Sequence, residues 1–307
     1  MKKRLLAALA IGASATLALG ACATGTDTGT DTDTGTDTGS QEQTDKMDLT
    51  VGVFNGWPEG EAASILWKLV LEDKGYNVNL EYANAGPVFA GIAGGDYDVA
   101  FDGWLPLTHQ SYMDEYGDKL TDLGAWNDEA SLTMAVNEDA PITSLDEMAA
   151  NADEFGNRIV GIEPGAGLTK VTQEQVIPGY GLEGMEFITS STPAMLAELT
   201  AALEDGENIA VTLWRPHWAY DEFPIRDLED PKGTLGDAES LHSIGKANFA
   251  TDYPNLTGWI GNFKMDSELL YSLENVMYNS GADASDYESI VAKWMTENQD
   301  YVDGLTE

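Results

Sequence analysis

The amino-acid sequence predicts an α/β fold of two lobes, each a mostly parallel sheet flanked by helices, with a ligand cleft between the lobes. From about residue 46, short β-type runs alternate with amphipathic segments, and this alternation falls into two blocks, before and after about residue 140. The chain has 307 residues, of which 43% are hydrophobic, so it can bury a core of that size. Strand–helix alternation at this spacing is typical of parallel sheets with helices on both faces.

Residues 1–21 are predicted to be a lipoprotein signal peptide, outside the fold. A basic start, MKKR, precedes an apolar Ala-rich run over residues 5–19. This run is shorter than the roughly 20 residues that a membrane span needs. It ends in LGAC, which resembles the bacterial lipobox, where cleavage precedes a cysteine that then carries lipid. We therefore expect lipidation at Cys22, the single cysteine. A buried free cysteine is the alternative.

Residues 22–45 are predicted to be a disordered tether. Residues 24–45 form a near-repeat of Thr, Asp and Gly with no apolar residue, and such a segment cannot bury a core. Calcium binding by its aspartates is an alternative, since calcium prefers oxygen ligands. The repeat lacks the apolar position that a calcium β-roll packs, which favours a spacer. No later stretch is long and apolar enough to span a bilayer.

The charge balance excludes several classes of protein. Lys and Arg total 15 against 53 Asp and Glu, a formal net charge of −38. Binding to nucleic acid or to an anionic membrane surface needs clustered basic residues, so neither is expected. The single cysteine excludes an intrachain disulfide and a cysteine-based zinc cluster. An acidic surface of this kind suggests a saline setting.

The elements are expected in the following order. Lobe 1 is expected over residues 46–140, lobe 2 over 141–240, and a return to lobe 1 with C-terminal helices over 241–307. Strands are expected at β-type runs, over residues 49–54, 78–82, 98–101, 132–136, 158–162, 186–189 and 208–213. Helices are expected where apolar residues recur at helical spacing, over residues 61–74, 88–93, 168–176, 194–203, 269–278 and 287–295.

Tryptophans follow three of the predicted strands. Trp57 comes after the first strand, Trp104 after the third and Trp214 after the seventh, each close to Pro or Gly. Open α/β sheets bind ligands beyond the carboxyl ends of their strands, so these rings are candidates for one site. A single tryptophan is explained equally well by core packing, but three at equivalent positions favour a site. Trp67 and Trp294 lie inside apolar helical segments and are predicted to be core.

Three indole rings suit a quaternary ammonium group, which aromatic cages bind. Each ring contributes about 0.5–2 kcal/mol, whereas micromolar affinity needs about 8 kcal/mol, so a second anchor is expected. The fifth strand is followed by EPGAG, which opens a helix at Gly167 and Leu168. Free amides at a helix N-terminus bind carboxylate or phosphate. His109 is positioned to donate a hydrogen bond to a carboxylate. The sequence therefore predicts a zwitterion as ligand.

Other chemistries have little support in the sequence. The three histidines, His109, His217 and His242, lack the spacing of a zinc motif. No GxSxG elbow, GxGxxG turn or P-loop is present. We therefore expect no enzyme activity, no cofactor and no metal. A secreted enzyme acting on quaternary amines and a purely structural surface protein are the alternatives from other classes.

The chain resembles the glycine betaine-binding proteins of osmoprotectant ABC transporters. The resemblance rests on five stretches that together run through nearly the whole folded part: NGW, GPVFAGIAGGDYDVAFDGWLPLTH, GIEPGAG, WRPHW and EDPKG. It implies a type II periplasmic-binding-protein fold. It also implies that Trp57, Trp104 and Trp214 hold a trimethylammonium group. Two departures from the family pattern are Leu168, often Ile, and Leu213, often Gly.

The resemblance further implies that His109 and the backbone amides of Gly167 and Leu168 hold the carboxylate of the ligand. The implied function is an extracytoplasmic, lipid-anchored receptor that binds glycine betaine or a related betaine. It would pass the solute to a membrane permease driven by a cytoplasmic ATPase. A receptor for choline, carnitine, proline betaine or a sulfonium analogue is the alternative within the same class.

Overall fold

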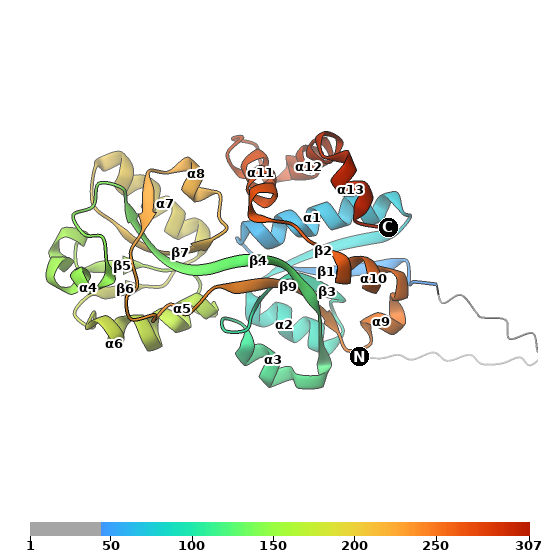
Figure 1. The fold of residues 1–307 in the computed structure, drawn as a ribbon, viewed down its shortest axis with the longest axis horizontal. Coiled ribbons are helices and arrows are strands. Elements are labelled where there is room, and N and C mark those ends of the chain that lie inside the picture. The colour runs from blue at the N-terminus through green and yellow to red at the C-terminus, as the bar shows by residue number, and fades with distance from the viewer. Residues whose placement is uncertain (1–43) are drawn as a thin grey trace, which may run out of the picture. The chain divides into compact units, whose positions relative to one another are not determined.

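The computed structural model describes residues 44–307 (Figure 1). The predicted signal peptide, Cys22 and nearly all of the predicted tether lie outside the described residues. The described chain folds into a mixed sheet of nine strands flanked by helices. The strand order is β2-β1-β3-β9-β4-β7-β5-β6, and β8 pairs with β4.

Two parallel groups of strands correspond to the two blocks of strand–helix alternation. The first group is β1 (Asp48–Phe54), β2 (Asn77–Ala83) and β3 (Val99–Leu105), in which β2 and β3 both pair in parallel with β1. The second group is β5 (Arg158–Val160), β6 (Glu186–Ile188) and β7 (Ala210–Arg215), in which β6 and β7 both pair in parallel with β5.

Two long strands join these groups by antiparallel pairing. The first part of β4 (Leu120–Asn137) pairs with β9 (Glu239–Lys246), and its last part pairs with β7 and with β8 (Ile225–Asp227). In Figure 1, β4 runs from one lobe into the other. The sequence predicted only residues 132–136 of β4 as strand, and β8 and β9 were not predicted. The described sheet is therefore mixed, with parallel pairing confined to the two outer groups.

All six predicted helices are present, with shifted ends. They are α1 (Pro58–Asp73), α2 (Ala85–Gly94), α5 (Gly167–Val171), α7 (Thr192–Asp205), α11 (Ser267–Tyr278) and α12 (Tyr287–Glu297). The helices that the sequence did not predict are α3 (Gln110–Tyr116), α4 (Leu145–Met148), α6 (Ile177–Tyr180), α8 (Ala219–Glu222), α9 (Phe249–Asp252), α10 (Pro254–Asn262) and α13 (Gln299–Gly304).

Helix α1 connects the first strand to the core. It begins at Pro58, three residues before the predicted start, because proline suits the first helical position and Trp57 supplies the extended N-cap. Its inner face is buried, and Trp67 is completely covered, which confirms the core prediction. Trp294 on α12 is 3% exposed, so it is also core as predicted.

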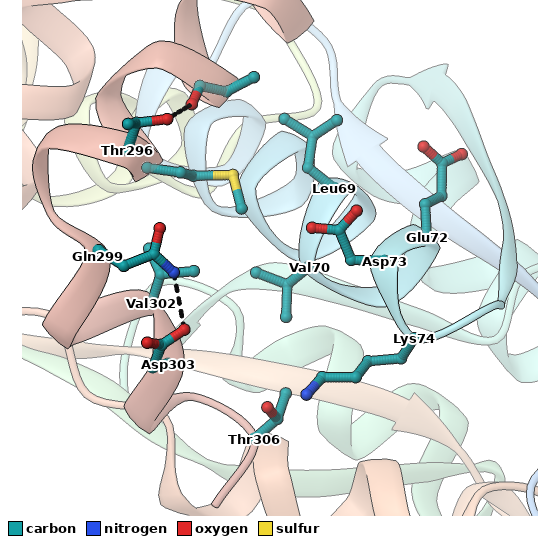
Figure 2. A pocket seen from close by; sticks show the side chains of 12 residues that line it. Leu69, Val70, Glu72, Asp73, Lys74, Thr296, Gln299, Val302, Asp303 and Thr306 are labelled. Carbon is teal, nitrogen blue, oxygen red and sulfur yellow. Dashed lines mark hydrogen bonds between the residues drawn. The ribbon is translucent and has the colours of Figure 1, made fainter.

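The last helices pack against α1 and leave a surface pocket between them (Figure 2). Leu69 and Val70 from α1 face Thr296 and Asp303 from the C-terminal helices there. This pocket shares no lining residue with the tryptophan site described below. Within residues 44–307, no helix combines the length and the apolar character that crossing a bilayer requires.

Candidate ligand-binding site

The three tryptophans singled out from the sequence surround one small cavity. Its volume is about 20 Å³. Trp57, Trp104 and Trp214, here called the tryptophan cage, are 6%, 2% and 3% exposed. The rest of the lining is Glu59, Thr108, Leu132, Ile162 and Leu168. The cage is therefore almost completely closed to solvent.

The cage rings come from both parallel groups of strands. Trp57 follows β1 directly and caps α1. Trp104 and Trp214 lie inside β3 and β7, each one residue before the strand ends, because both strands are longer than predicted. The ring centroids of Trp57 and Trp214 are 6.0 Å apart, with the planes at 56°. The expectation that these three residues share one cavity is thus met in the structure, although two of them are strand residues.

His109 supports the cage from behind. Its ring stacks on Trp57 with the centroids 5.6 Å apart and the planes parallel within 1°. Its Nδ1 accepts a hydrogen bond from the backbone N–H of Trp104 at 2.9 Å. Burial lowers the pKa of His109 to about 3, so the ring is neutral and its proton is on Nε2. Nε2 has no hydrogen-bond partner among the described residues, and His109 does not line the cavity.

The start of α5 lies beside the cage. Leu168 lines the cavity, and Gly167 packs against Thr108 so closely that a Cβ there would lie 2.4 Å from Thr108 Cγ2. The first amides of a helix have no acceptor within the helix, so those of α5 are available to a ligand. The hydroxyl of Tyr112 donates to the carbonyl of Gly165 at 3.0 Å. This is a second contact between the two halves of the molecule, one containing β1–β3 and the other β5–β7.

Glu163 is a further residue of the site that sequence reasoning missed. Its carboxylate accepts hydrogen bonds from the backbone N–H of Thr192 at 2.8 Å and from the Thr192 hydroxyl at 3.1 Å, so it caps α7. It also accepts a long hydrogen bond of 3.5 Å from the indole N–H of Trp57. Glu163 therefore links a cage ring to the second group of strands. Its position directly after the fifth predicted strand was the available signal.

Three buried carboxyl groups beside the cage were also missed. Glu59 lines the cavity, and its neighbours Asp102 and Glu274 are equally buried. Burial raises the pKa of Glu59 to about 7, and burial also raises the pKa of Asp102 and of Glu274. No pattern in the sequence distinguishes them, because they are 3 among 53 acidic residues.

The remaining histidines do not form a metal site with His109. His217 packs edge-to-face on Trp214 with the centroids 4.7 Å apart, and its Nδ1 accepts from the backbone N–H of Ala219 at 3.1 Å. His242 pairs with Asp122 at 2.9 Å. Within residues 44–307, no three His, Cys, Asp or Glu side chains are grouped as metal ligands.

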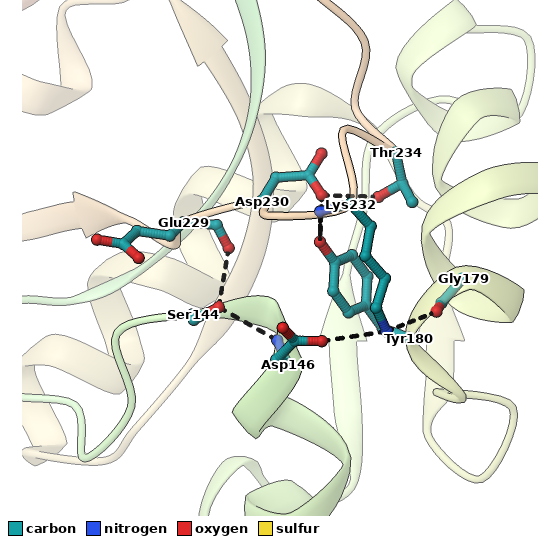
Figure 3. Close-up of polar contacts among 8 residues, drawn as sticks. All are labelled: Ser144, Asp146, Gly179, Tyr180, Glu229, Asp230, Lys232 and Thr234. Carbon is teal, nitrogen blue, oxygen red and sulfur yellow. Dashed lines mark hydrogen bonds and ion pairs between the residues drawn. The ribbon is translucent and has the colours of Figure 1, made fainter.

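The residues of the EDPKG stretch contact neighbouring residues of the same lobe (Figure 3). The ammonium group of Lys232 lies 4.3 Å from the ring centroid of Tyr180 and 3.1 Å from the Asp146 carboxylate. Asp230 accepts from the Tyr180 hydroxyl and from the backbone N–H of Leu235. None of these residues lines the cage cavity, so this stretch stabilises a loop.

Comparison with known protein families shows to which family the chain belongs. Residues 47–297, most of the chain, match the family described as the substrate binding domain of the ABC-type glycine betaine transport system. The chain belongs to this family. Its members are binding components of transporters rather than enzymes.

One curated relative agrees with the family assignment. A glycine betaine/carnitine transport binding protein of Listeria monocytogenes is 34% identical over 157 residues, and this alignment spans 50% of the chain and 51% of that protein. The chain thus matches about half the length of this curated relative.

Solved structures of the family share the fold. A glycine betaine/L-proline-binding protein of Borrelia burgdorferi superposes with a TM-score of 0.78 at 27% identity, over 85% of this chain and 97% of that one. A lactococcal protein in its closed form with glycine betaine gives 0.78 at 23% identity, over 85% and 100%. The fold is therefore that of the type II periplasmic binding proteins, as the sequence predicted.

Proposed function

We propose that this protein is the extracytoplasmic substrate-binding component of an ABC importer and that its ligand is glycine betaine. The observation that carries the proposal is the convergence of Trp57, Trp104 and Trp214 on a cavity that is also lined by Leu168, in the first turn of α5. The trimethylammonium group would occupy the cage, since indole faces attract cations that have no hydrogen-bond donors.

The carboxylate of the ligand would bind at the start of α5. The amides of Gly167 and Leu168 are at the positive end of that helix, where an anion is stabilised. The neutral ring of His109 carries its proton on Nε2, which is free to donate once a ligand carboxylate is within reach. Cage and helix N-terminus together supply the two anchors that micromolar affinity needs.

Calorimetry with glycine betaine tests the proposal, with Trp104→Ala as the variant. Losing one ring of the cage is expected to weaken binding by about tenfold or more. Trp294→Ala is the control, since that ring is equally buried but lies on α12. Unchanged affinity in Trp104→Ala would contradict the cage.

The alternative ligands are choline, carnitine, proline betaine and a sulfonium analogue. Choline has no carboxylate, so it would leave the α5 amides and His109 without a partner. A thermal-shift panel of these compounds with glycine betaine separates them, because each ligand raises the melting temperature according to its concentration relative to its Kd. A larger shift with choline than with glycine betaine would assign the alternative. Release of a product from glycine betaine would indicate an enzyme.

The proposed location follows from the N-terminal sequence and the family. Binding components of ABC importers act outside the cytoplasm, and cleavage before Cys22 would leave a lipid anchor there, followed by a flexible tether. The folded part would then comprise lobe 1 over 46–140, lobe 2 over 141–240 and the return over 241–307, and would deliver its ligand to the permease. Cys22→Ala is expected to move the protein from the membrane fraction to the soluble fraction. Retention in the membrane would contradict the anchor.

A further inference from the structure

Three buried carboxyl side chains beside the tryptophan cage have no partner of opposite charge. Glu59, Asp102 and Glu274 are 0%, 1% and 0% exposed. Among residues 44–307, none of the three forms an ion pair with Lys, Arg or His. Both oxygens of Glu59 and of Glu274, and Oδ2 of Asp102, make no hydrogen bond there. Only Glu59 of the three lines the cavity.

The first turn of α1 fixes the Glu59 carboxyl next to the cage. Glu59 is the second residue of this 16-residue helix, whose positive end favours a carboxylate. Asp102 packs against the same turn, since a Cβ on Gly60 would lie 2.4 Å from its Oδ2. Trp104 donates its indole N–H to Asp102 Oδ1 at 2.9 Å, so Asp102 already has one donor. Glu59 has no such bond.

Burial favours the protonated form of these carboxyl groups in the absence of a cation. It raises the pKa of Glu59 to about 7. Burial, followed by the charge of Glu59, raises the pKa of Asp102 and of Glu274, and Asp221 adds to the effect on Glu274.

The basic groups nearest to the cage give Glu59 no compensating charge. Burial lowers the pKa of His217 to about 3 and of His109 to about 3, so both rings are neutral near pH 7. Arg215 is held by Asp227 at 2.7 Å and lies over the ring of Tyr220. A positive charge next to Glu59 therefore has to come from a molecule inside the cavity.

We propose that Glu59 is the counter-ion of the onium group and gives up its proton when that group enters the tryptophan cage. The inference rests on the proposed function. In the ligand-free protein the carboxyl group holds a proton below about pH 7. On binding, the O–H bond breaks, the carboxylate faces the fixed positive charge of the ligand, and the proton passes to solvent. Binding is then linked to proton release, and the protein selects cationic ligands over neutral ones of the same shape.

The expected pH dependence follows from this exchange. A bound cation lowers the pKa of Glu59, so affinity rises as pH increases toward the ligand-free value of about 7 and is constant above it. The slope reaches at most about tenfold per pH unit, which corresponds to one proton released. The carboxylate of glycine betaine stays ionised in this range and contributes nothing to the slope.

Calorimetry of the full chain with glycine betaine, from about pH 5.5 to about pH 8.5, measures this linkage. Repeating each titration in two buffers of different ionisation enthalpy gives the number of protons released. We expect part of one proton to be released below pH 7, most between the ligand-free and the bound pKa of Glu59, and none at the alkaline end. The second probe is 3,3-dimethylbutanoate, in which a neutral tert-butyl group replaces trimethylammonium. It is expected to bind without releasing a proton.

Substitutions test whether the released proton comes from Glu59. Glu59→Gln is expected to abolish proton release and to lower affinity at pH 8 by about tenfold, while differing little from the unmodified protein at the acid end. Asp102→Asn should retain proton release. Glu61→Gln is the matched control, because Glu61 is on the same turn of α1 but accepts from the Tyr278 hydroxyl outside the cage. Melting temperatures of the ligand-free variants report whether each one folds.

The outcomes separate this inference from the proposed function. A constant Kd across the pH range without proton release contradicts the inference and leaves glycine betaine binding intact. Proton release that persists in Glu59→Gln, or that disappears in Asp102→Asn, contradicts the assignment to Glu59. Failure of every onium compound to bind at any pH contradicts the proposed function itself.

Discussion

His109 illustrates how much a single side chain contributes to the site without lining it. It orients the backbone of Trp104 through Nδ1 and supports the ring of Trp57 by stacking. A buried donor or acceptor that loses its partner costs about 1–3 kcal/mol. His109 therefore determines both the positions of two cage rings and part of the stability of the fold.

The protonation of His109 leads to a prediction about stability. Its folded pKa of about 3 lies below the unfolded value of 6.5, so the unfolded chain binds the additional proton. The free energy of unfolding that this residue contributes is present above pH 6.5 and is lost as pH falls toward 3, by at most about 1.4 kcal/mol per pH unit. Ring ¹⁵N chemical shifts that stay constant from pH 8 to pH 5 would agree, and a titration in that range would contradict it.

The tryptophans were predictable, whereas the carboxyl groups were not. Trp57, Trp104 and Trp214 are rare residues at recurring positions, so their pattern is visible in the sequence. Glu59 is an acidic residue in a chain dominated by acidic residues, and only burial distinguishes it. Burial depends on packing between segments that are far apart in the sequence, which one sequence does not show.

At the scale of elements, the start of α5 is where the two halves of the molecule meet. Gly167 has no side chain, and this allows Thr108 to approach the first turn of the helix. Glu239 holds the Thr108 side of this contact by accepting the backbone N–H of Thr108 at 2.7 Å. The contact depends on a glycine because any Cβ would overlap the opposite loop.

Gly167→Ala is therefore expected to hold the two halves apart. A Cβ at this position would lie 2.5 Å from the Thr108 carbonyl oxygen, which requires the backbone to move. Affinity for glycine betaine should fall by about tenfold or more, with little change in the ligand-free melting temperature. Gly165→Ala is the control, since a Cβ there meets no atom within 4 Å. Equal affinities for both variants, measured by calorimetry, would show that this contact is not needed for binding.

The strands that were not predicted share a physical cause. The first part of β4 contains Asp122, Gly124 and Asn127 and pairs irregularly with β9, so its sequence lacks the alternation of a half-buried strand. Its β structure is imposed by tertiary pairing rather than by local preference. The parallel strands were predictable because burial on both faces gives them continuous apolar runs.

For the whole molecule, the dominant feature is negative charge. With 15 basic against 53 acidic residues, the folded state repels itself, and few of the carboxylates have a basic partner. Glycine betaine has no net charge, so this field should affect its binding much less than it affects folding.

Salt is accordingly expected to raise the free energy of unfolding. At about 1 M the Debye length is roughly 3 Å, so most repulsion between surface carboxylates is screened. Denaturant titrations in low and in about 1 M potassium chloride, each with and without ligand, measure the effect. Full stability and full binding at very low salt would contradict a protein adapted to a saline setting.

The near-complete covering of the cage rings, 6%, 2% and 3% exposed, has a kinetic consequence. A solute held between these rings would escape only after the two halves separate. The separation rate then sets an upper limit on dissociation that is common to all solutes the chamber accepts. Ligands would then differ in how long each one keeps the two halves closed. This time would set how long a transporter has to bind the closed protein.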